Sequence, residues 1–331
     1  MKPKPVSVFA FAPIDPKTYA VHDLHRVQRA WQESNCYIDV WIEVLHAQRL
    51  DPLASFPFVL TIDFEGDQWT FFKPPLEDLN TMYGLEVQEL NVWRPLINHV
   101  VEHLSGGKVV LTEANSFYLP DTQGTDYRQN HVKTTIGIQE IDVEARWLRY
   151  FHNRGYHELS GDDFAHTFRL DRPLDPTALP LFAEFVRFSR IERLPAEELL
   201  ARSKGLLKKH LRRRPATNPV ARFKPRFIAD VEWLKSAGLA TFHGHAFATL
   251  RQLGAAFEFA TEYVRWLGAR GEAGLEPIAA HFDAISENTK ALVLKTARAV
   301  NTKRAVDFAP LLDTIEASWQ GGMDALAARF G

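Results

Sequence analysis

The chain has little cysteine and little net charge, and both facts limit what it can be. Cys36 is the single cysteine among 331 residues, which excludes an internal disulfide and any zinc site built from several thiolates. The net charge of −2 gives no global attraction to nucleic acid or to a membrane surface. No stretch approaches the roughly 20 apolar residues of a membrane span. The apolar stretch 8–12 is too short for a signal peptide, so we expect a cytoplasmic protein.

Hydrophobic residues make up 46% of the chain and charged residues 24%, which is ordinary for a globular protein. The length suggests two domains. Strand and short helix signals fill the chain up to about residue 172, and only helical signals follow. We therefore expect an α+β fold: an α+β domain over 1–172 followed by an all-helical domain over 173–331.

The hydrophobic patterns also predict individual elements. In the first half we expect a helix from Cys36 to about Leu50, helices over 76–83 and 93–104, a strand from Lys108, strands over 58–64 and 68–72, and a hairpin of 131–141 with 146–152. In the second half we expect helices over 176–189, 195–211, 219–237, 240–268, 275–300 and 306–329.

Cys36 lies where the first long helix should begin. Ser34 or Asn35 can cap that helix by accepting a bond from a free backbone N–H. The following residues are almost wholly apolar, broken by Asp39 and Glu43, which is typical of a buried helix. A thiol in the first turn meets the positive end of the helix dipole, which favours thiolate. Cys36 is therefore either a catalytic nucleophile held at the start of a helix or a small buried apolar residue.

His131 follows a loop and opens a strand. The apolar residues Val132, Ile136 and Ile138 have the opposite parity, so His131 need not be buried with them. A cysteine at a helix start with a histidine at the start of a later strand is the arrangement of papain-like folds, in which the histidine takes the thiol proton. The alternative is a surface or structural histidine.

Three segments carry a family resemblance: 108–111 (KVVL), 115–120 (NSFYLP) and 130–138 (NHVKTTIGI). They resemble the core of the butirosin-type acyltransferases, which are similar to papain-like cysteine enzymes and move an acyl group from a carrier-protein thioester to an amine. The chain is also similar over nearly its whole length to an uncharacterised bacterial family often found beside amino acid:carrier-protein ligases. The resemblance implies a papain-like domain with Cys36 as nucleophile and His131 as base.

The remaining parts of such a site are less defined. Asn153 matches the orienting third residue by position, and Asp142 in the hairpin turn is the alternative. The backbone N–H of Cys36 supplies one oxyanion donor. Gln32 and Asn35 are candidates for the second donor.

The expected function is transfer of an acyl or aminoacyl group from a carrier-protein thioester through a Cys36 acyl-enzyme to a small-molecule amine. The enzyme would need no cofactor of its own, and the partner carrier protein would bring phosphopantetheine. One alternative is a thioesterase or cysteine peptidase of the same fold, which differs in the acceptor. Another is a non-catalytic carrier-binding module in which Cys36 is merely packed.

A basic run extends from Arg202 to Arg226, with ten lysines or arginines and no acidic residue. It is either a solvated helix face or a docking patch for an acidic carrier protein and its phosphate. The docking candidates are Lys208, Lys209, Arg212, Arg213 and Arg214.

Two patterns suggest metal sites. His99 and His103 flank Glu102 as in an inverted zincin motif, but the helix pattern points His99 and Glu102 away from the apolar stripe. Glu43 and His46 have the spacing of half a di-iron site, although with Asp39 they more simply form a polar seam. We expect no metal.

Overall fold

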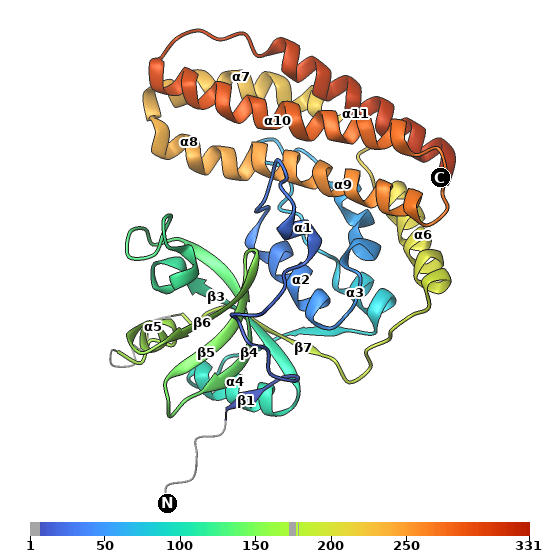
Figure 1. Ribbon diagram of the computed structural model, residues 1–331. Coiled ribbons are helices and arrows are strands. Elements are labelled where there is room, and N and C mark those ends of the chain that lie inside the picture. Colours follow the sequence, from blue (N-terminus) through green and yellow to red (C-terminus); the bar gives the residue numbers. More distant parts are fainter. Residues whose placement is uncertain (1–6, 172–176, 178) are drawn as a thin grey trace, which may run out of the picture. The chain divides into compact units, whose positions relative to one another are not determined.

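The computed structural model describes residues 7–171, 177 and 179–331. The chain forms two compact units, each built from several segments (Figure 1). The first unit comprises the chain up to Val27, Asn35–Asp51 and Leu79–Arg193. The second unit comprises Gln28–Ser34, Pro52–Asp78 and Leu194–Gly331. An antiparallel sheet in the first unit and helices in the second confirm the α+β class.

The first unit contains a sheet of seven strands in its described residues. The strands are β1 (Val8–Phe9), β2 (Glu86–Glu89), β3 (Lys108–Asn115), β4 (Lys133–Asp142), β5 (Trp147–His152), β6 (Gly155–Ser160) and β7 (Ala183–Arg187). Their order is β2-β7-β3-β4-β5-β6, with β1 paired to the end of β4, and all neighbours are antiparallel. The β4–β5 hairpin confirms the hairpin that the sequence predicts.

The two faces of β4 have different neighbours. On one face, Gly137 lies under α2 (Cys36–Ala47), where an added Cβ would be 3.1 Å from Val40 Cγ1. On the other face, Ile136 and Ile138 join a core with α4 (Leu96–Ser105). Because side chains alternate along a strand, the odd-numbered residues of β4 up to Gly137 face α2 and the even-numbered residues up to Ile138 face the α4 core. A register shift between Ile138 and Glu140 interrupts this order, and Ile141 also belongs to the α4 core.

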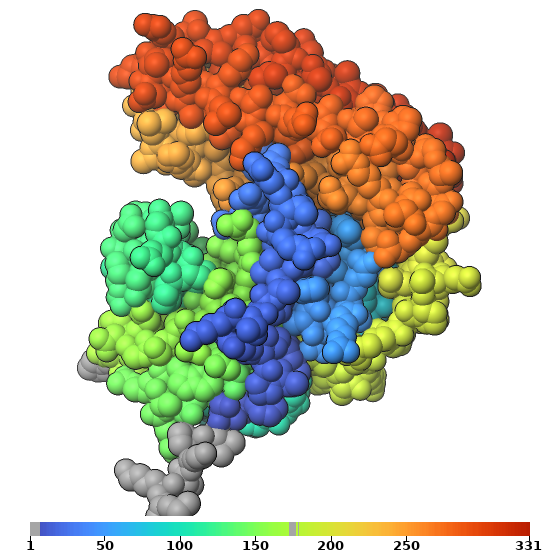
Figure 2. Space-filling view, viewed as in Figure 1, coloured from blue at the N-terminus to red at the C-terminus, as the bar shows by residue number. Residues whose placement is uncertain are grey.

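Shorter elements complete the first unit. The segment after residue 7 runs over the surface of the sheet (dark blue in Figure 2), where Gln139 Nε2 donates to Phe11 O at 2.6 Å. The remaining helices are α1 (Asp23–Arg26), α3 (Leu76–Tyr83), which continues from the second unit, α5 (Asp162–Thr167) and the 3-10 turns Ser116–Tyr118 and Pro120–Thr122.

The second unit is helical. Its long helices are α6 (Ala196–Arg212), α7 (Pro219–Ala237), α8 (Leu239–Ala246), α9 (Gln252–Ala269), α10 (Glu276–Thr302) and α11 (Ala309–Phe330). A π-helical segment, Phe247–Arg251, joins α8 to α9 where the sequence predicts one continuous helix. π-geometry frees backbone carbonyls, and Ala248 O accepts from Trp69 N–H at 3.1 Å. Among the described residues, no helix is long and apolar enough to cross a membrane.

Three sequence predictions are wrong. The strand predicted over 58–64 belongs mostly to a 3-10 helix, Pro52–Thr61, and only a single bridge, Phe64 to Trp69, remains of the second predicted strand. A short apolar run does not distinguish a buried strand from a buried helix. The helix predicted over 176–189 contains β7 instead, while residues 176 and 178 of that segment lie outside the described residues.

Candidate active site

Cys36 is the first residue of α2, and Asn35 is the residue that caps this helix. The side-chain Oδ1 of Asn35 accepts from Ile38 N–H at 3.0 Å, and its backbone carbonyl accepts from Asp39 N–H at 3.1 Å. Asn35 itself is extended, with φ −137° and ψ 150°. Cys36 therefore occupies the first turn, where the capping pattern places it.

The Cys36 side chain is half-buried, whereas residues 37–45 of the same helix are buried. Its Sγ lies 3.7 Å from Thr135 Oγ1 on the α2-facing side of β4. A thiol donates to the hydroxyl oxygen in this contact, while a thiolate would accept the hydroxyl proton. Thr135 can therefore contact the sulfur favourably in both protonation states.

The two side chains predicted as further oxyanion donors are placed differently. The Asn35 side chain is buried and uses its Oδ1 as the helix cap. Gln32 is exposed and belongs to the segment Gln28–Ser34 of the second unit. The N–H groups of Ile38 and Asp39 are already bonded to Asn35, which leaves the N–H of Cys36 at the open end of the helix.

His131 is exposed and lies just before β4. Its Nδ1 is 2.8 Å from Asn115 Nδ2, and its ring stacks on Phe117 with a centroid distance of 4.3 Å. Within the described chain, no hydrogen bond joins His131 to Cys36. The structure therefore places the two predicted catalytic residues against different partners.

Asn115 determines which nitrogen of His131 carries the proton. Asn115 Oδ1 accepts from Phe117 N–H at 3.2 Å, which turns the amide Nδ2 toward the imidazole. Nδ1 of His131 is then the acceptor, and a neutral ring carries its proton on Nε2. In this arrangement neither nitrogen is open to receive the thiol proton.

The two candidates for the third catalytic residue lie in turns. Asn153 has φ 45° in the turn between β5 and β6. Asp142 Oδ1 accepts from Ala145 N–H at 2.8 Å and closes the β4–β5 turn. Neither forms a hydrogen bond with His131 in the described residues. The residue that does is Asn115, which begins the segment 115–120 and has no sequence signal that marks it as a partner of the histidine.

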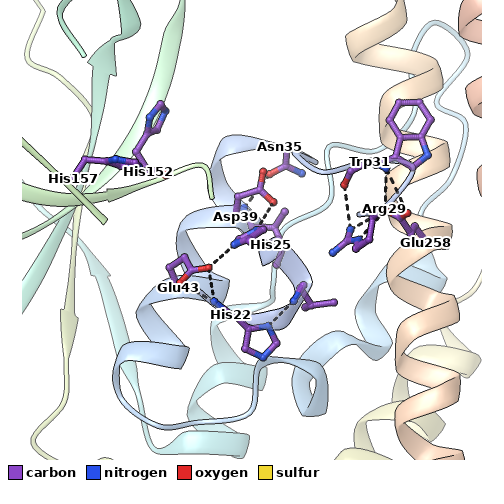
Figure 3. Close-up of polar contacts among 12 residues, drawn as sticks. His22, His25, Arg29, Trp31, Asn35, Asp39, Glu43, His152, His157 and Glu258 are labelled. Atoms are coloured by element: carbon purple, nitrogen blue, oxygen red, sulfur yellow. Dashed lines mark hydrogen bonds and ion pairs between the residues drawn. The ribbon is translucent and has the colours of Figure 1, made fainter. Parts of the chain in front are cut away.

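A buried polar cluster lies along α2 (Figure 3). His25 of α1 lies between two carboxylates of α2, with Nδ1 2.5 Å from Glu43 Oε1 and Nε2 3.5 Å from Asp39 Oδ1. These three side chains are at most 1% exposed. Glu43 also accepts from Tyr19 Oη at 2.6 Å and from His22 N–H at 3.2 Å.

The charges of this cluster follow from burial and pairing. Burial opposes a charge on His25, but its contacts with Asp39 and Glu43 outweigh burial and raise the pKa of His25. Burial would raise the pKa of Glu43, yet the bond and charge of His25 lower that pKa. Burial, aided by the nearby His46, lowers the pKa of His22 to about 4. The cluster is thus an imidazolium between two carboxylates, beside a neutral imidazole.

A second buried imidazole lies on the other face of the sheet. His152 Nε2 is 2.7 Å from Thr134 Oγ1, and its Nδ1 is 2.6 Å from Asp121 Oδ2. This hydroxyl–imidazole–carboxylate order is that of a catalytic triad. However, the His152 side chain is 1% exposed and Thr134 is 6% exposed. Figure 3 shows His152 well apart from Asp39, and the three groups satisfy one another inside the core.

The inverted zincin pattern does not form a metal site. His99 is buried and meets the Trp93 ring with a centroid distance of 5.9 Å, Glu102 forms an ion pair with Arg94, and His103 stacks on Phe185 with a centroid distance of 4.6 Å. The three side chains thus have separate partners. The described part of the chain holds no group of three or more histidine, cysteine, aspartate or glutamate side chains suited to a metal ion.

Two family matches together span most of the chain. The N-terminal domain of the DUF1839 family matches residues 20–188, and its C-terminal domain matches residues 196–328. The chain belongs to the DUF1839 family. The first match contains both Cys36 and His131, and the second contains the helices α6 to α10 and all but the last two residues of α11. No curated protein matches the chain.

The basic run lies in the C-terminal DUF1839 domain. Lys209 Nζ is 2.7 Å from Asp78 Oδ1 and also bonds Glu77, while Arg213 is 3.8 Å from Glu77. These contacts lie within the second unit. Lys209 and Arg213 are therefore partly neutralised by the protein itself, which weakens the run as a docking patch.

The other predicted docking residues divide into two kinds. Arg214 Nη1 donates to the Leu211 carbonyl at 2.7 Å and so closes the end of α6. Lys208 and Arg212 are exposed and form no ion pair with any described residue. They are the members of the predicted patch that remain open to a partner.

Proposed function

We propose that the first unit is a papain-like domain that transfers an acyl or aminoacyl group through Cys36. The observation that carries this proposal is the position of the sulfur, half-buried at the first turn of a buried helix and beside the Thr135 hydroxyl. The helix N-terminus favours negative charge on a thiolate and on a carbonyl oxygen under attack. A cysteine that only fills space would need neither feature.

In the first step the Cys36 thiolate attacks the carbonyl carbon of a thioester. A carbon–sulfur bond to Cys36 forms, and the negative oxygen lies against the Cys36 N–H. The intermediate collapses as the carbon–sulfur bond of the donor breaks. The departing thiol takes the proton that Cys36 gave to the base, so the acyl-enzyme forms without net change of charge.

His131 is the proposed base, and its location defines what must move. His131 has the parity of Thr135 but lies before β4, and four residues correspond to about 13 Å along an extended strand. For His131 to act on Cys36, its imidazole would have to leave Asn115, and the backbone just before β4 would have to move with it when substrate binds. Catalytic hydrogen bonds commonly tighten only in the substrate complex.

In the second step an amine attacks the acyl-enzyme, releases the Cys36 thiolate and yields an amide. His131 would take the proton that the amine loses. The donor would be a carrier-protein thioester, since exchange between thioesters is nearly isoenergetic. Water in place of the amine would make the same domain a thioesterase.

Intact-protein mass spectrometry tests the acyl-enzyme. Incubating the protein with acetyl-pantetheine or glycyl-pantetheine thioester should add one acyl mass to the wild type and none to Cys36→Ala. His131→Gln should slow this acylation about 100-fold or more, because general base catalysis contributes at least that much. His243→Gln, which alters an exposed histidine of the second unit, is the matched control and should acylate like the wild type.

The outcomes separate the candidate functions. A wild-type protein that gains no acyl mass, and whose Cys36 resists alkylation until unfolding, would be a binding module with a packed cysteine. An adduct that forms equally fast in His131→Gln would remove the histidine from the mechanism. Adding candidate amines to the acyl-enzyme distinguishes a transferase, which gives the amide mass, from a hydrolase, which gives the free acid.

A further inference from the structure

The segment Gln28–Ser34 is anchored to the helices of the second unit by Trp31. The indole Nε1 donates to Ser286 Oγ of α10 at 3.1 Å. The other side of the ring lies against Gly254 of α9, where an added Cβ would be 2.3 Å from the indole. The Trp31 side chain is therefore seated on both helices, and the residue is 3% exposed. Trp31, Ser286 and Gly254 form what we call the Trp31 seat.

The carboxylate next to this seat accepts hydrogen bonds from three residues of the segment Gln28–Ser34. Glu258 of α9 accepts from Arg29 Nη2 at 2.8 Å, from Ala30 N–H at 2.8 Å and from Trp31 N–H at 3.2 Å. The Arg29–Glu258 pair is nearly buried, with side chains 5% and 9% exposed. Arg29 and Glu258 therefore neutralise each other.

Two further cations at the seat lack such a carboxylate. Lys290 Nζ lies 4.5 Å from the centroid of the Trp31 ring, one turn after Ser286 on α10. Arg251, the last residue of the π-helical segment before α9, lies one turn before Gly254. Both are half-buried, and neither forms an ion pair with any residue that the structure describes.

The two cations also influence each other. Burial lowers the pKa of Lys290, the positive charge of Arg251 lowers it further, and the negative charge of Glu258 opposes both effects. Glu258 is already paired with Arg29, and two half-buried like charges without an ion-pair partner of their own are costly unless an anion joins them. A phosphate group suits the pair, because arginine and lysine both bind phosphate oxygens through charge-assisted hydrogen bonds.

We propose that Lys290 and Arg251, beside the Trp31 indole, bind the phosphate of a phosphopantetheine thioester. This inference rests on the proposed function, because it supplies the donor that Cys36 would attack. In any arrangement of the two units, Trp31 and Cys36 are five residues apart, so their Cα atoms are at most about 18 Å apart. That separation is within the reach of an extended pantetheine arm.

Calorimetric titration of the Cys36→Ala protein tests the site without any chemistry. The probes are pantetheine, 4′-phosphopantetheine and coenzyme A. We expect 4′-phosphopantetheine to bind at least tenfold more tightly than pantetheine. Lys290→Met and Arg251→Gln should each remove most of that difference and leave pantetheine binding unchanged. Lys295→Met, an exposed lysine of the same α10, is the matched control and should keep the full difference.

Coenzyme A identifies the source of the phosphate. Binding as tight as that of 4′-phosphopantetheine supports a free coenzyme A thioester, and weaker binding supports the carrier-bound arm. Equal affinities for pantetheine and 4′-phosphopantetheine would overturn the phosphate site and leave Cys36 acylation untouched. A phosphate preference in a protein whose wild type forms no acyl-enzyme would overturn the proposed function alone. Circular dichroism of each variant verifies that it is folded.

Discussion

Substituting Glu43 by glutamine removes the buried charge that holds His25. Glu43 accepts from Tyr19, His22 and His25 with its side chain 0% exposed. Breaking a buried ion pair typically costs 3–5 kcal/mol, and the glutamine amide preserves part of the packing. We therefore expect Glu43→Gln to destabilise the first unit by about 3 kcal/mol where the pair is fully charged.

The pH range in which Glu43→Gln costs most follows from the pKa shifts of His25 and Glu43. The pKa of His25 is raised above 6.5, so its contribution is complete below pH 6.5 and is lost as pH rises through the folded pKa. The pKa of Glu43 is lowered below 4.5, so its contribution is complete above pH 4.5 and is lost as pH falls through the folded pKa. The cost of Glu43→Gln should thus be largest between pH 4.5 and 6.5 and should decrease at pH 9.

Urea unfolding at pH 5.5 and pH 9 measures this cost. Amide exchange of the α2 peptides assigns the transition to the first unit, because two units need not unfold together. Glu144→Gln, an exposed glutamate of the β4–β5 turn, is the matched control and should leave the midpoint unchanged. A cost below about 1 kcal/mol, or an equal cost at both pH values, would refute the charged pair.

Two further substitutions test local contacts. Thr135→Val should slow alkylation of Cys36 by about three- to tenfold, because a hydrogen bond of about 1 kcal/mol to the thiolate is lost. Thr135→Ser keeps the hydroxyl and should restore the rate. A valine variant that reacts as fast as the wild type would contradict this prediction. Gly254→Ala should destabilise the second unit by about 2 kcal/mol, measured by thermal unfolding, because its Cβ would overlap Trp31. Gly268→Ala on the same helix meets nothing within 4 Å and should not destabilise.

Helices whose first and last residues carry their own start and stop signals could be predicted from the sequence. The helix over 219–237 has Asn218 as its cap, Pro219 at its first position and Gly238, with φ 88°, at its end. The first two residues set the start of a helix and the third ends it, all within the segment itself. The same is true of the start of α2 at Cys36, where Asn35 alone defines the boundary.

Elements whose conformation depends on residues far away in the chain could not be predicted from the sequence. β7 pairs with β3 and β2, which precede it by about seventy residues or more, and its own residues fit a helix pattern equally well. The segment Pro52–Thr61 is a continuous apolar run whose conformation is decided by burial against α6 and α9. Tertiary packing overrides local preference in both cases.

The candidate site divides in the same way. Asp39 and Glu43 could be identified as a polar seam, because carboxylates in an apolar helix require partners. The partner is His25, eighteen residues before Glu43, while His46 bonds the Ala20 carbonyl at 3.0 Å instead. Nothing in the local pattern distinguishes His25 from the other twelve histidines.

The charge of His25 should influence how fast Cys36 reacts with an alkylating agent. Asp39 is three residues after Cys36 on α2, where side chains are about 6 Å apart. At an effective dielectric constant of about 20, a carboxylate at that distance opposes a thiolate by about 3 kcal/mol. We expect the imidazolium of His25, 3.5 Å from Asp39, to offset about half of this repulsion.

His25→Gln should therefore slow alkylation of Cys36 at pH 7 by about tenfold, because roughly half of that 3 kcal/mol is no longer compensated. The double variant His25→Gln with Asp39→Asn removes the opposing charge as well and should return the rate toward that of the wild type. A structural role of His25 alone would leave the double variant at least as impaired as the single one. Equal rates in all three proteins would show that the charges along α2 do not reach its first turn.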